Sequence, residues 1–333
     1  MAAIWLGIAF AISANFVFAL SNVFFRKTEK DTSPTMINLF RTSIGVLSFF
    51  LIALFSGILP IVFTLPLDLV GLLMLSSIFG QVVGDSAYFY SQFYLGPTKA
   101  LTISLTYPFF TILIDIFYLH VPFNPFILLS ATIIGIGILL VSCSKRKSVE
   151  IITESYHQEK INRPKKGILL GILFAFIASL SWAIGITLTD ISMTQINEIF
   201  STERLTSIVG SLVRLPIAAF VLVIINYTLY GLLKKKNSNK LDMNDHLTYL
   251  IRGRSLTSWL WLFAGALIGT TLGLYLFTEA AYLAGAVPMA ILITTGPIFT
   301  LVLDWIVNKE KISFLGLVGI VITLCGIIFI TVL

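Results

Sequence analysis

Charged residues, cysteine and histidine are all scarce in this chain of 333 residues. Asp, Glu, Lys and Arg together make up 11% of the chain, whereas hydrophobic residues make up 57% and the mean hydropathy is +0.97. A water-soluble domain of this length could not carry so much apolar surface, so the composition excludes a soluble protein. The sequence predicts a protein that crosses a lipid bilayer several times.

The two cysteines exclude a disulfide framework. Cys143 and Cys325 lie in apolar runs without metal-ligand or redox spacing, which is typical of small buried residues. His120, His157 and His246 all fall in predicted loops and form no ligand cluster, so we expect no metal site. The GxxxxGK[ST] loop that binds nucleoside triphosphates is also missing, so we expect neither a cofactor nor a self-powered pump.

Long apolar runs are abundant, and ten of them could cross a bilayer as helices of about 20 residues. They lie at 2–25, 35–58, 68–94, 98–119, 124–143, 167–190, 205–232, 257–283, 286–307 and 312–332. The first segment lacks the basic start of a secretory signal and shares a residue pattern with the sixth. We therefore expect it to remain in the mature protein.

The second half of the chain repeats the first. The stretch Gly80–Asp115 returns 189 positions later as Gly269–Asp304, the first and sixth segments match at an offset of 164, and Arg41 matches Arg214 at an offset of 173. The residues shared by the two long stretches are, in the first copy, Gly80, Gly84, Gly96, Thr106, Pro108, Phe110, Thr111 and Asp115. This repeat predicts two domains, residues 1–143 and 167–333, joined by a basic linker at 144–166.

Each copy of the long repeat predicts a tight helical hairpin. An apolar segment ends at a glycine, turns near Pro97 or Pro288 and runs back as a second apolar segment. Glycines allow close approach of backbones, and a proline inside an apolar helix frees a carbonyl and favours a kink. Interrupted segments at matching places in two halves are the sequence feature that best indicates the binding site of a transporter.

The predicted fold is an all-α polytopic membrane protein with ten transmembrane helices arranged as two inverted five-helix repeats. The inversion follows because an odd number of crossings in each half places the halves in opposite orientations, with the pseudo-two-fold axis in the membrane plane. Of the 22 Lys and Arg, Arg41 and Arg214 lie within segments and Arg204 alone lies on the less basic side. The linker 144–166 and the loop 234–256 are therefore predicted to be cytoplasmic, with both termini outside the cell membrane.

Two five-helix halves, each with an arginine in the second helix and a glycine-rich third helix that turns into a TxPxFT helix, resemble the EamA-like family of the drug/metabolite transporter superfamily. The resemblance covers nearly the whole chain. It is closer in the second half, where Glu310 precedes the last helix, than in the first, which has His120 there. Such proteins carry amino acids, sugars, nucleotide-linked metabolites and drugs, so the resemblance implies a small-molecule carrier without identifying its substrate.

Asp85 is the deepest acid in the predicted membrane region. Gln81, Asp85, Tyr88 and Gln92 are spaced four, three and four residues apart, which places them on one face of the third helix. An ionisable group at this depth costs at least about 2.5–3.5 kcal/mol on insertion scales, so it needs a partner, a cavity or a function. We expect this face to line a water-accessible cavity in which Asp85 binds a coupling proton or cation. The alternative is a face that packs through interhelical hydrogen bonds.

The eighth helix carries a corresponding stripe of Tyr275, Glu279 and Tyr282, although Glu279 lies close enough to the outer end to reach interfacial water instead. Asn15 in the first helix and Trp182 in the sixth are further candidates for contacting a ligand. Packing is the alternative for Trp182, because aromatic residues in apolar helices commonly serve it.

The repeated charges predict two gates that alternate. Arg41 would meet Asp304 when the inner gate is shut, and Arg214 would meet Asp115 when the outer gate is shut, so that transport exchanges one ion pair for the other. The alternative is that each arginine extends to the lipid headgroups and each aspartate reaches water.

The predicted function is secondary transport of a small metabolite by alternating access, without catalysis. The expected partners are a small-molecule substrate, the lipid bilayer and a coupling proton or cation. Nucleic acid is excluded because the basic residues occupy short loops, and the oligomeric state stays open. A cation channel or divalent-cation pathway is the first alternative, although such a site would need several converging acids. An intramembrane aspartyl protease is a remote one, because Val82 stands where a GxGD motif needs glycine.

Overall fold

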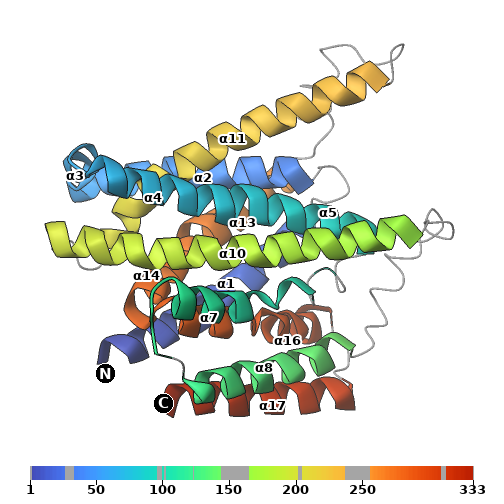
Figure 1. Cartoon of the computed structure of the whole chain (residues 1–333). Helices are drawn as coiled ribbons and strands as arrows, with labels where there is room; N and C mark the ends of the chain where they lie inside the picture. The colour runs from blue at the N-terminus through green and yellow to red at the C-terminus, as the bar shows by residue number, and fades with distance from the viewer. Residues whose placement is uncertain are drawn as a thin grey trace.

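The structure is a computed structural model that describes residues 2–26, 34–95, 100, 103–122, 124–143, 165–201, 205–236, 256–308 and 313–332. All regular secondary structure in these residues is helical. Most of the helices run along a common direction and form a bundle (Figure 1). The predicted all-helical fold is therefore confirmed.

The helices of the first half are α1 (Ala2–Arg26), α2 (Pro34–Ser56), α3 (Leu59–Phe63), α4 (Leu67–Ser77), the π-helix η1 (Ile78–Gly84), α5 (Asp85–Leu95), α7 (Tyr107–Phe117) and α8 (Pro125–Cys143). Those of the second half are α10 (Lys165–Phe200), α11 (Thr206–Lys236), α13 (Leu256–Ala266), the π-helix η3 (Leu267–Gly273), α14 (Leu274–Ala284), α15 (Ala286–Ile293), α16 (Gly296–Asn308) and α17 (Phe314–Val332).

Six described helical stretches are long and apolar enough to cross a membrane, by length and composition: Ala3–Phe25, Met36–Ser56, Leu67–Tyr88, Gly167–Phe200, Thr206–Thr228 and Leu256–Ala284. Shorter apolar helices, at Tyr107–Phe117, Pro125–Val141, Ala286–Phe299 and Phe314–Phe329, lie within the other predicted segments. Large apolar side chains such as Phe55 and Phe314 are exposed on the bundle surface, where acyl chains rather than water would suit them.

Helix α10 is longer than the sequence predicted. The apolar sixth segment was expected to end at residue 190, but α10 continues for 36 residues to Phe200. Polar residues follow Asp190, and they lower hydropathy without breaking a helix, because Gly and Pro are absent between residues 186 and 200. The end of the apolar run was therefore not the end of the helix.

The hairpin of the second half turns at a glycine rather than at the proline that the sequence analysis named. Gly285 has φ +87° and separates α14 from α15, whereas Pro288 lies in the first turn of α15, where a missing backbone N–H costs nothing. The corresponding turn of the first half, with Gly96 and Pro97, lies outside the described residues.

The fourth and ninth predicted segments, which are the fourth segments of the two halves, are interrupted at equivalent places. Thr294 and Thr295 separate α15 from α16, and Thr106 precedes α7 at the equivalent position. Pro297 and Pro108 are the second residues of the helices that restart there. Proline removes an N–H donor and clashes with the preceding turn, so the TxP sequence sets the break.

The third segment contains a π-helix in each half, and the two π-helices lie 189 positions apart, at Ile78–Gly84 and Leu267–Gly273. A π-helical stretch inside an α-helix is rare and is frequent at functional sites. In the first half the helix resumes at Asp85, so the predicted coupling acid is the first residue after the π-helix. The sequence repeat is therefore matched by a repeated local distortion.

The π-helices also mark where each half packs against the other. Helix α10 contacts α4, η1 and α5, and α1 contacts α13, η3 and α14. A Cβ atom on Gly84 would lie 2.5 Å from the Trp182 ring, and one on Gly273 would lie 2.8 Å from the Phe18 ring. Only glycine leaves room for these rings, which places aromatic side chains directly against both π-helices.

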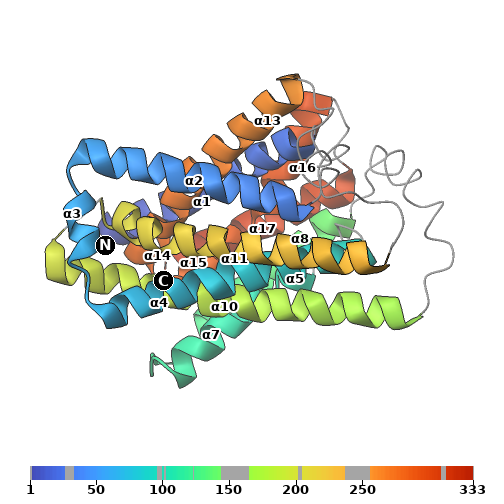
Figure 2. The same ribbon diagram turned by 90° about the horizontal axis from the view of Figure 1, so that it is seen from above.

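The last helices of the two halves, α8 and α17, pack against each other on one side of the bundle (Figure 1). The two chain termini lie at one end of the bundle, and the ends of α8 and α10 that flank residues 144–164 lie at the other (Figures 1 and 2).

Candidate functional site

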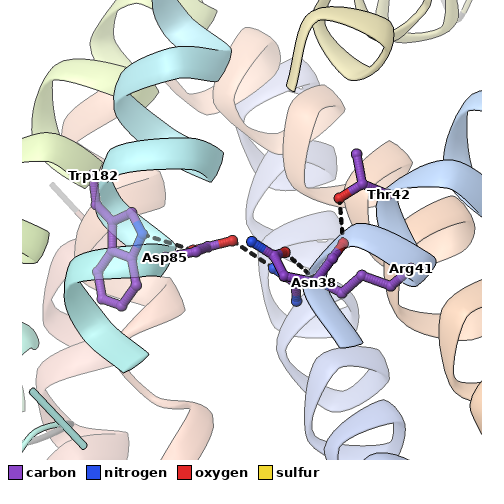
Figure 3. Close-up of polar contacts among 5 residues, drawn as sticks. All are labelled: Asn38, Arg41, Thr42, Asp85 and Trp182. Carbon is purple, nitrogen blue, oxygen red and sulfur yellow. Dashed lines mark hydrogen bonds and ion pairs between the residues drawn. The ribbon is translucent and has the colours of Figure 1, made fainter. Parts of the chain in front are cut away.

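Asp85 joins three helices through two hydrogen bonds. Its Oδ2 accepts from Arg41 Nη2 of α2 at 2.5 Å, which is also an ion pair, and its Oδ1 accepts from Trp182 Nε1 of α10 at 3.0 Å (Figure 3). The side chains of Arg41 and Asp85 are 28% and 17% exposed, so the pair is largely but not completely shielded. The carboxylate therefore connects the two halves of the chain at a point that the protein does not completely enclose.

Arg41 is held in place by its own helix. Its Nε donates to Asn38 Oδ1 at 2.8 Å, and Thr42 Oγ1 donates to the Asn38 carbonyl at 2.7 Å (Figure 3). Asn38 and Arg41 lie three residues apart and thus on one face of α2. Asn38 was not predicted, although an amide one turn before an arginine within an apolar segment is a signal that could have identified it.

Aromatic rings surround the indole of Trp182. The ring centroids of Tyr88 and Trp182 are 5.3 Å apart, and those of Tyr107 and Trp182 are 6.1 Å apart with an edge-to-face geometry. Tyr107 was not predicted, and its phenolic oxygen is buried without a hydrogen-bond partner. Asp85 and Tyr88 of the third predicted segment and Trp182 of the sixth thus form one cluster.

The rest of the predicted stripe on the third segment is only partly described. Gln81 lies in η1, one turn before Asp85, and its Oε1 is buried without a hydrogen-bond partner. Gln92 lies in α5, but its side chain falls outside the described part of the structure.

The stripe of the second half, formed by Tyr275, Glu279 and Tyr282, differs because its acid is buried. Glu279 is 1% exposed, and its Oε1 accepts from Ser207 Oγ at 2.5 Å, so this acid is in the interior rather than in contact with interfacial water. Tyr275 and Tyr282 pack against the apolar cluster that contains Leu215 and Leu274. Ser207 of α11 was not predicted, because its proximity to Glu279 arises only from helix packing.

Asn15 bonds to the interrupted fourth segment of the other half. Its Nδ2 donates to the Leu292 carbonyl at 2.7 Å and to Thr295 Oγ1 at 2.9 Å, at the break between α15 and α16. The equivalent break in the first half makes an equivalent contact, a hydrogen bond of 2.9 Å between the Thr106 and Ser179 hydroxyls. The Asn15 amide donor is therefore occupied by a contact between the halves.

Arg214 is the counterpart of Arg41 but has a different environment. It is 3% exposed, and its Nε and Nη1 are buried without hydrogen-bond partners. The two acceptors used by Arg41 are replaced in the second half, because Ser211 stands at the position of Asn38 and Leu274 at the position of Asp85.

The predicted gate residues are not arranged as the two alternating ion pairs. Arg41 bonds to Asp85, and the side chain of Asp304 lies outside the described part of the structure. Asp115 Oδ1 is buried without a hydrogen-bond partner among the described residues, and Oδ2 of Asp190 in α10 accepts from the Ala286 backbone N–H at 2.9 Å. No ion pair joins Asp115 to Arg214 among the described residues. The gate pairings stay predictions about other conformations.

Among the described residues, no group of three or more His, Cys, Asp and Glu side chains is arranged to hold a metal ion.

The chain belongs to the EamA-like transporter family, which it matches over residues 5–143 and 169–332. An uncharacterized transporter of Archaeoglobus fulgidus is 25% identical over 327 residues, which is 97% of this chain and 97% of that protein. A protein of known crystal structure shares the fold with a TM-score of 0.71 and 13% identity, over 100% of this chain and 96% of that one. The predicted family resemblance is confirmed, and the chain is a multi-pass membrane transporter.

Proposed function

We propose that the protein is a secondary carrier that moves a small metabolite by alternating access between two inverted five-helix halves, without catalysing a reaction. The observation that supports this most strongly is that Asp85 bonds to Arg41 within its own half and to Trp182 in the other half. A change in the charge of one carboxylate then alters contacts on both sides of the boundary between the halves. Such a change is what couples a proton or cation to a conformational equilibrium.

The repeated contacts support this arrangement of the halves. The contact between Gly84 and Trp182 corresponds to that between Gly273 and Phe18, and Phe18 precedes Trp182 by the offset of 164 that relates the first and sixth segments. Thr106 with Ser179 and Thr295 with Asn15 form a second such pair. Each half therefore contacts the other through equivalent residues. In such an inverted repeat, each half can adopt the conformation that the other half had before, which is how transport can proceed.

In the proposed mechanism, charged Asp85 holds Arg41 and Trp182 together. Binding of a proton to Asp85 removes the ion pair, so Arg41 no longer has an anionic partner and the contact from α2 through α5 to α10 weakens. A cation at Asp85 would compete with Arg41 for the same oxygens. In either case the substrate and the coupling ion act through the difference in free energy between the two conformations.

Replacing Asp85 with Asn tests this mechanism, because Asn keeps the shape and an oxygen acceptor but cannot change its charge. In proteoliposomes, D85N should lose gradient-driven accumulation while retaining exchange across the membrane. The control is Asp68→Asn in the first turn of α4, which removes an exposed carboxylate elsewhere on the same segment. Full gradient-driven accumulation by D85N, with D68N behaving as wild type, would exclude Asp85 from coupling.

We further propose that the linker 144–166 and the loop 234–256 are cytoplasmic and that both termini lie outside. The two termini lie at one end of the bundle and the helix ends that flank the linker lie at the other, which supports opposite sides for them (Figure 1). The basic residues of the linker and the loop favour the cytoplasmic side for these two segments. Single cysteines at Ser155 and Ser238, placed in a chain that lacks Cys143 and Cys325, should resist an impermeant thiol reagent in intact cells. Labelling of either position without permeabilisation would reverse the orientation.

A further inference from the structure

Arg214 lies on the face of α11 that packs toward the first half. One turn before it, a Cβ on Gly210 would meet Met193 of α10 and Leu73 of α4, and one turn after it, Ala218 packs with Val82 of η1. Residues four apart on a helix share a face, so Arg214 lies between these contacts. With 3% of its surface exposed, its charge is in the interior of the protein.

The buried charge of Arg214 lacks the neutralising contacts that Arg41 has. Within the described part of the chain, its Nε and Nη1 have no hydrogen-bond partner, and Ser211 Oγ, one turn earlier on the same face, is also buried without one. A buried guanidinium without an anionic partner is costly, and it is stabilised when an anion binds it. In the first repeat that anion is the carboxylate of Asp85, and in the second its position is taken by Leu274.

We propose that Arg214 and Ser211 form a binding site for the carboxylate of a small organic monoanion, which takes the role that Asp85 has beside Arg41. The guanidinium and the hydroxyl together present donors on one helix face, and charge-assisted hydrogen bonds from arginine to carboxylate are among the strongest in proteins. This proposal rests on the proposed carrier function and adds the chemical class of the ligand.

A monocarboxylate fits this site better than a phosphate does. The site supplies one positive charge, so a dianion would leave a second negative charge uncompensated in the interior. The surroundings are apolar, because Leu215, the next residue of α11, belongs to one hydrophobic cluster with Leu274 and the partly buried Tyr275. The ligand should therefore combine one carboxylate with an apolar remainder.

The binding test uses the purified full-length protein and two probes of equal shape, benzoate and its neutral amide, benzamide. Benzoate should raise the melting temperature of wild type more than benzamide does. Arg214→Met should weaken benzoate binding about tenfold or more, because charge-assisted hydrogen bonds are lost, and should leave benzamide unaffected. Inorganic phosphate is the third probe. Equal effects of benzoate and benzamide, or stabilisation by phosphate alone, would overturn the proposal.

A second test needs no external ligand, because Leu274→Asp places an acid at the position equivalent to Asp85. In the presence of Arg214 this substitution should be tolerated and should weaken benzoate binding by competing for the guanidinium. In the Arg214→Met background the same acid has no partner and should lower the melting temperature strongly. If Leu274→Asp were equally destabilising in both backgrounds and left benzoate binding unchanged, the site would not exist.

These outcomes separate the ligand proposal from the carrier proposal. Binding is measured in detergent without a gradient, so it is independent of transport. Benzoate binding through Arg214 in a protein whose Asp85→Asn variant still accumulates solute would keep the anion site and remove the coupling mechanism. A carrier that behaves as proposed at Asp85 but binds benzoate and benzamide equally would keep the coupling mechanism and remove the anion site.

Discussion

The two halves of this transporter contain the same arginine in two electrostatic environments. Arg41 bonds to Asn38 and Asp85, whereas Arg214, at the matching position, has two buried nitrogen atoms without partners. The scaffold around the arginines is nevertheless repeated, since both halves contain a π-helix at the same relative position. The repeated contacts thus determine the architecture, while single differences, Asp85 against Leu274 above all, give Arg41 an anionic partner and leave Arg214 without one among the described residues.

The halves also differ where their first helices, α1 and α10, contact the π-helices η3 and η1. Ser21 of α1 meets Gly269, and its Oγ donates to the Gly265 carbonyl at 2.8 Å. At the equivalent position of α10 stands Gly185, where a Cβ would lie 2.8 Å from the Cα of Gly80. One contact accommodates a hydroxyl, and the other brings two backbones together.

The largest expected effect comes from adding a side chain at the close contact between Gly185 and Gly80. Gly185→Val should destabilise the protein by about 3 kcal/mol or more, because the added side chain meets backbone that cannot rotate away. Gly71→Val in α4 is the matched control, since nothing lies within 4 Å of a Cβ built at Gly71. Thermal unfolding in detergent measures both. Equal stability of the two variants would show that the halves do not meet through Gly80 and Gly185.

A smaller effect should distinguish the two arginines. Arg41→Met leaves Asp85 without its cationic partner and should cost about 1–3 kcal/mol of unfolding free energy. Arg214→Met removes a buried charge that has no anionic partner among the described residues, so it should leave the melting temperature unchanged or raise it. Melting curves of the two variants without ligand make the comparison. A loss at Arg214 as large as that at Arg41 would mean that the two arginines are equally paired, and the contrast between the halves would disappear.

The smallest expected effect concerns Trp182 of the second half, whose Nε1–H donates a hydrogen bond to Asp85 of the first half. Trp182→Phe makes the residue beside η1 identical to Phe18 beside η3, keeping a ring but removing the Nε1–H that bonds to Asp85. The expected cost is about 1 kcal/mol, with slower gradient-driven uptake that is not abolished as in D85N. Trp5→Phe is the control, because Trp5 is 53% exposed at the bundle surface. Uptake by W182F equal to that of W5F would show that the indole donor has no role in coupling.

The membrane environment, the positions of the apolar segments and the internal repeat could all be predicted from the sequence alone. These properties are local or periodic, since hydropathy is read from neighbouring residues and a repeat is read by comparing the chain with itself. The spacing of Asp85 and Tyr88 on one helix face was predictable for the same reason. The family followed from these features together with the repeated TxPxFT sequence.

Which side chains contact one another depends on how the helices pack, and this could not be predicted from the sequence. Asp85 lies 44 residues from Arg41 and 97 from Trp182, and no sequence spacing connects them. Because helices in a membrane are apolar on nearly all sides, their hydropathy does not encode the rotation that points one polar side chain at another. For the same reason the sequence could not show that helix packing gives Arg41 the carboxylate of Asp85 and, among the described residues, gives none to Arg214.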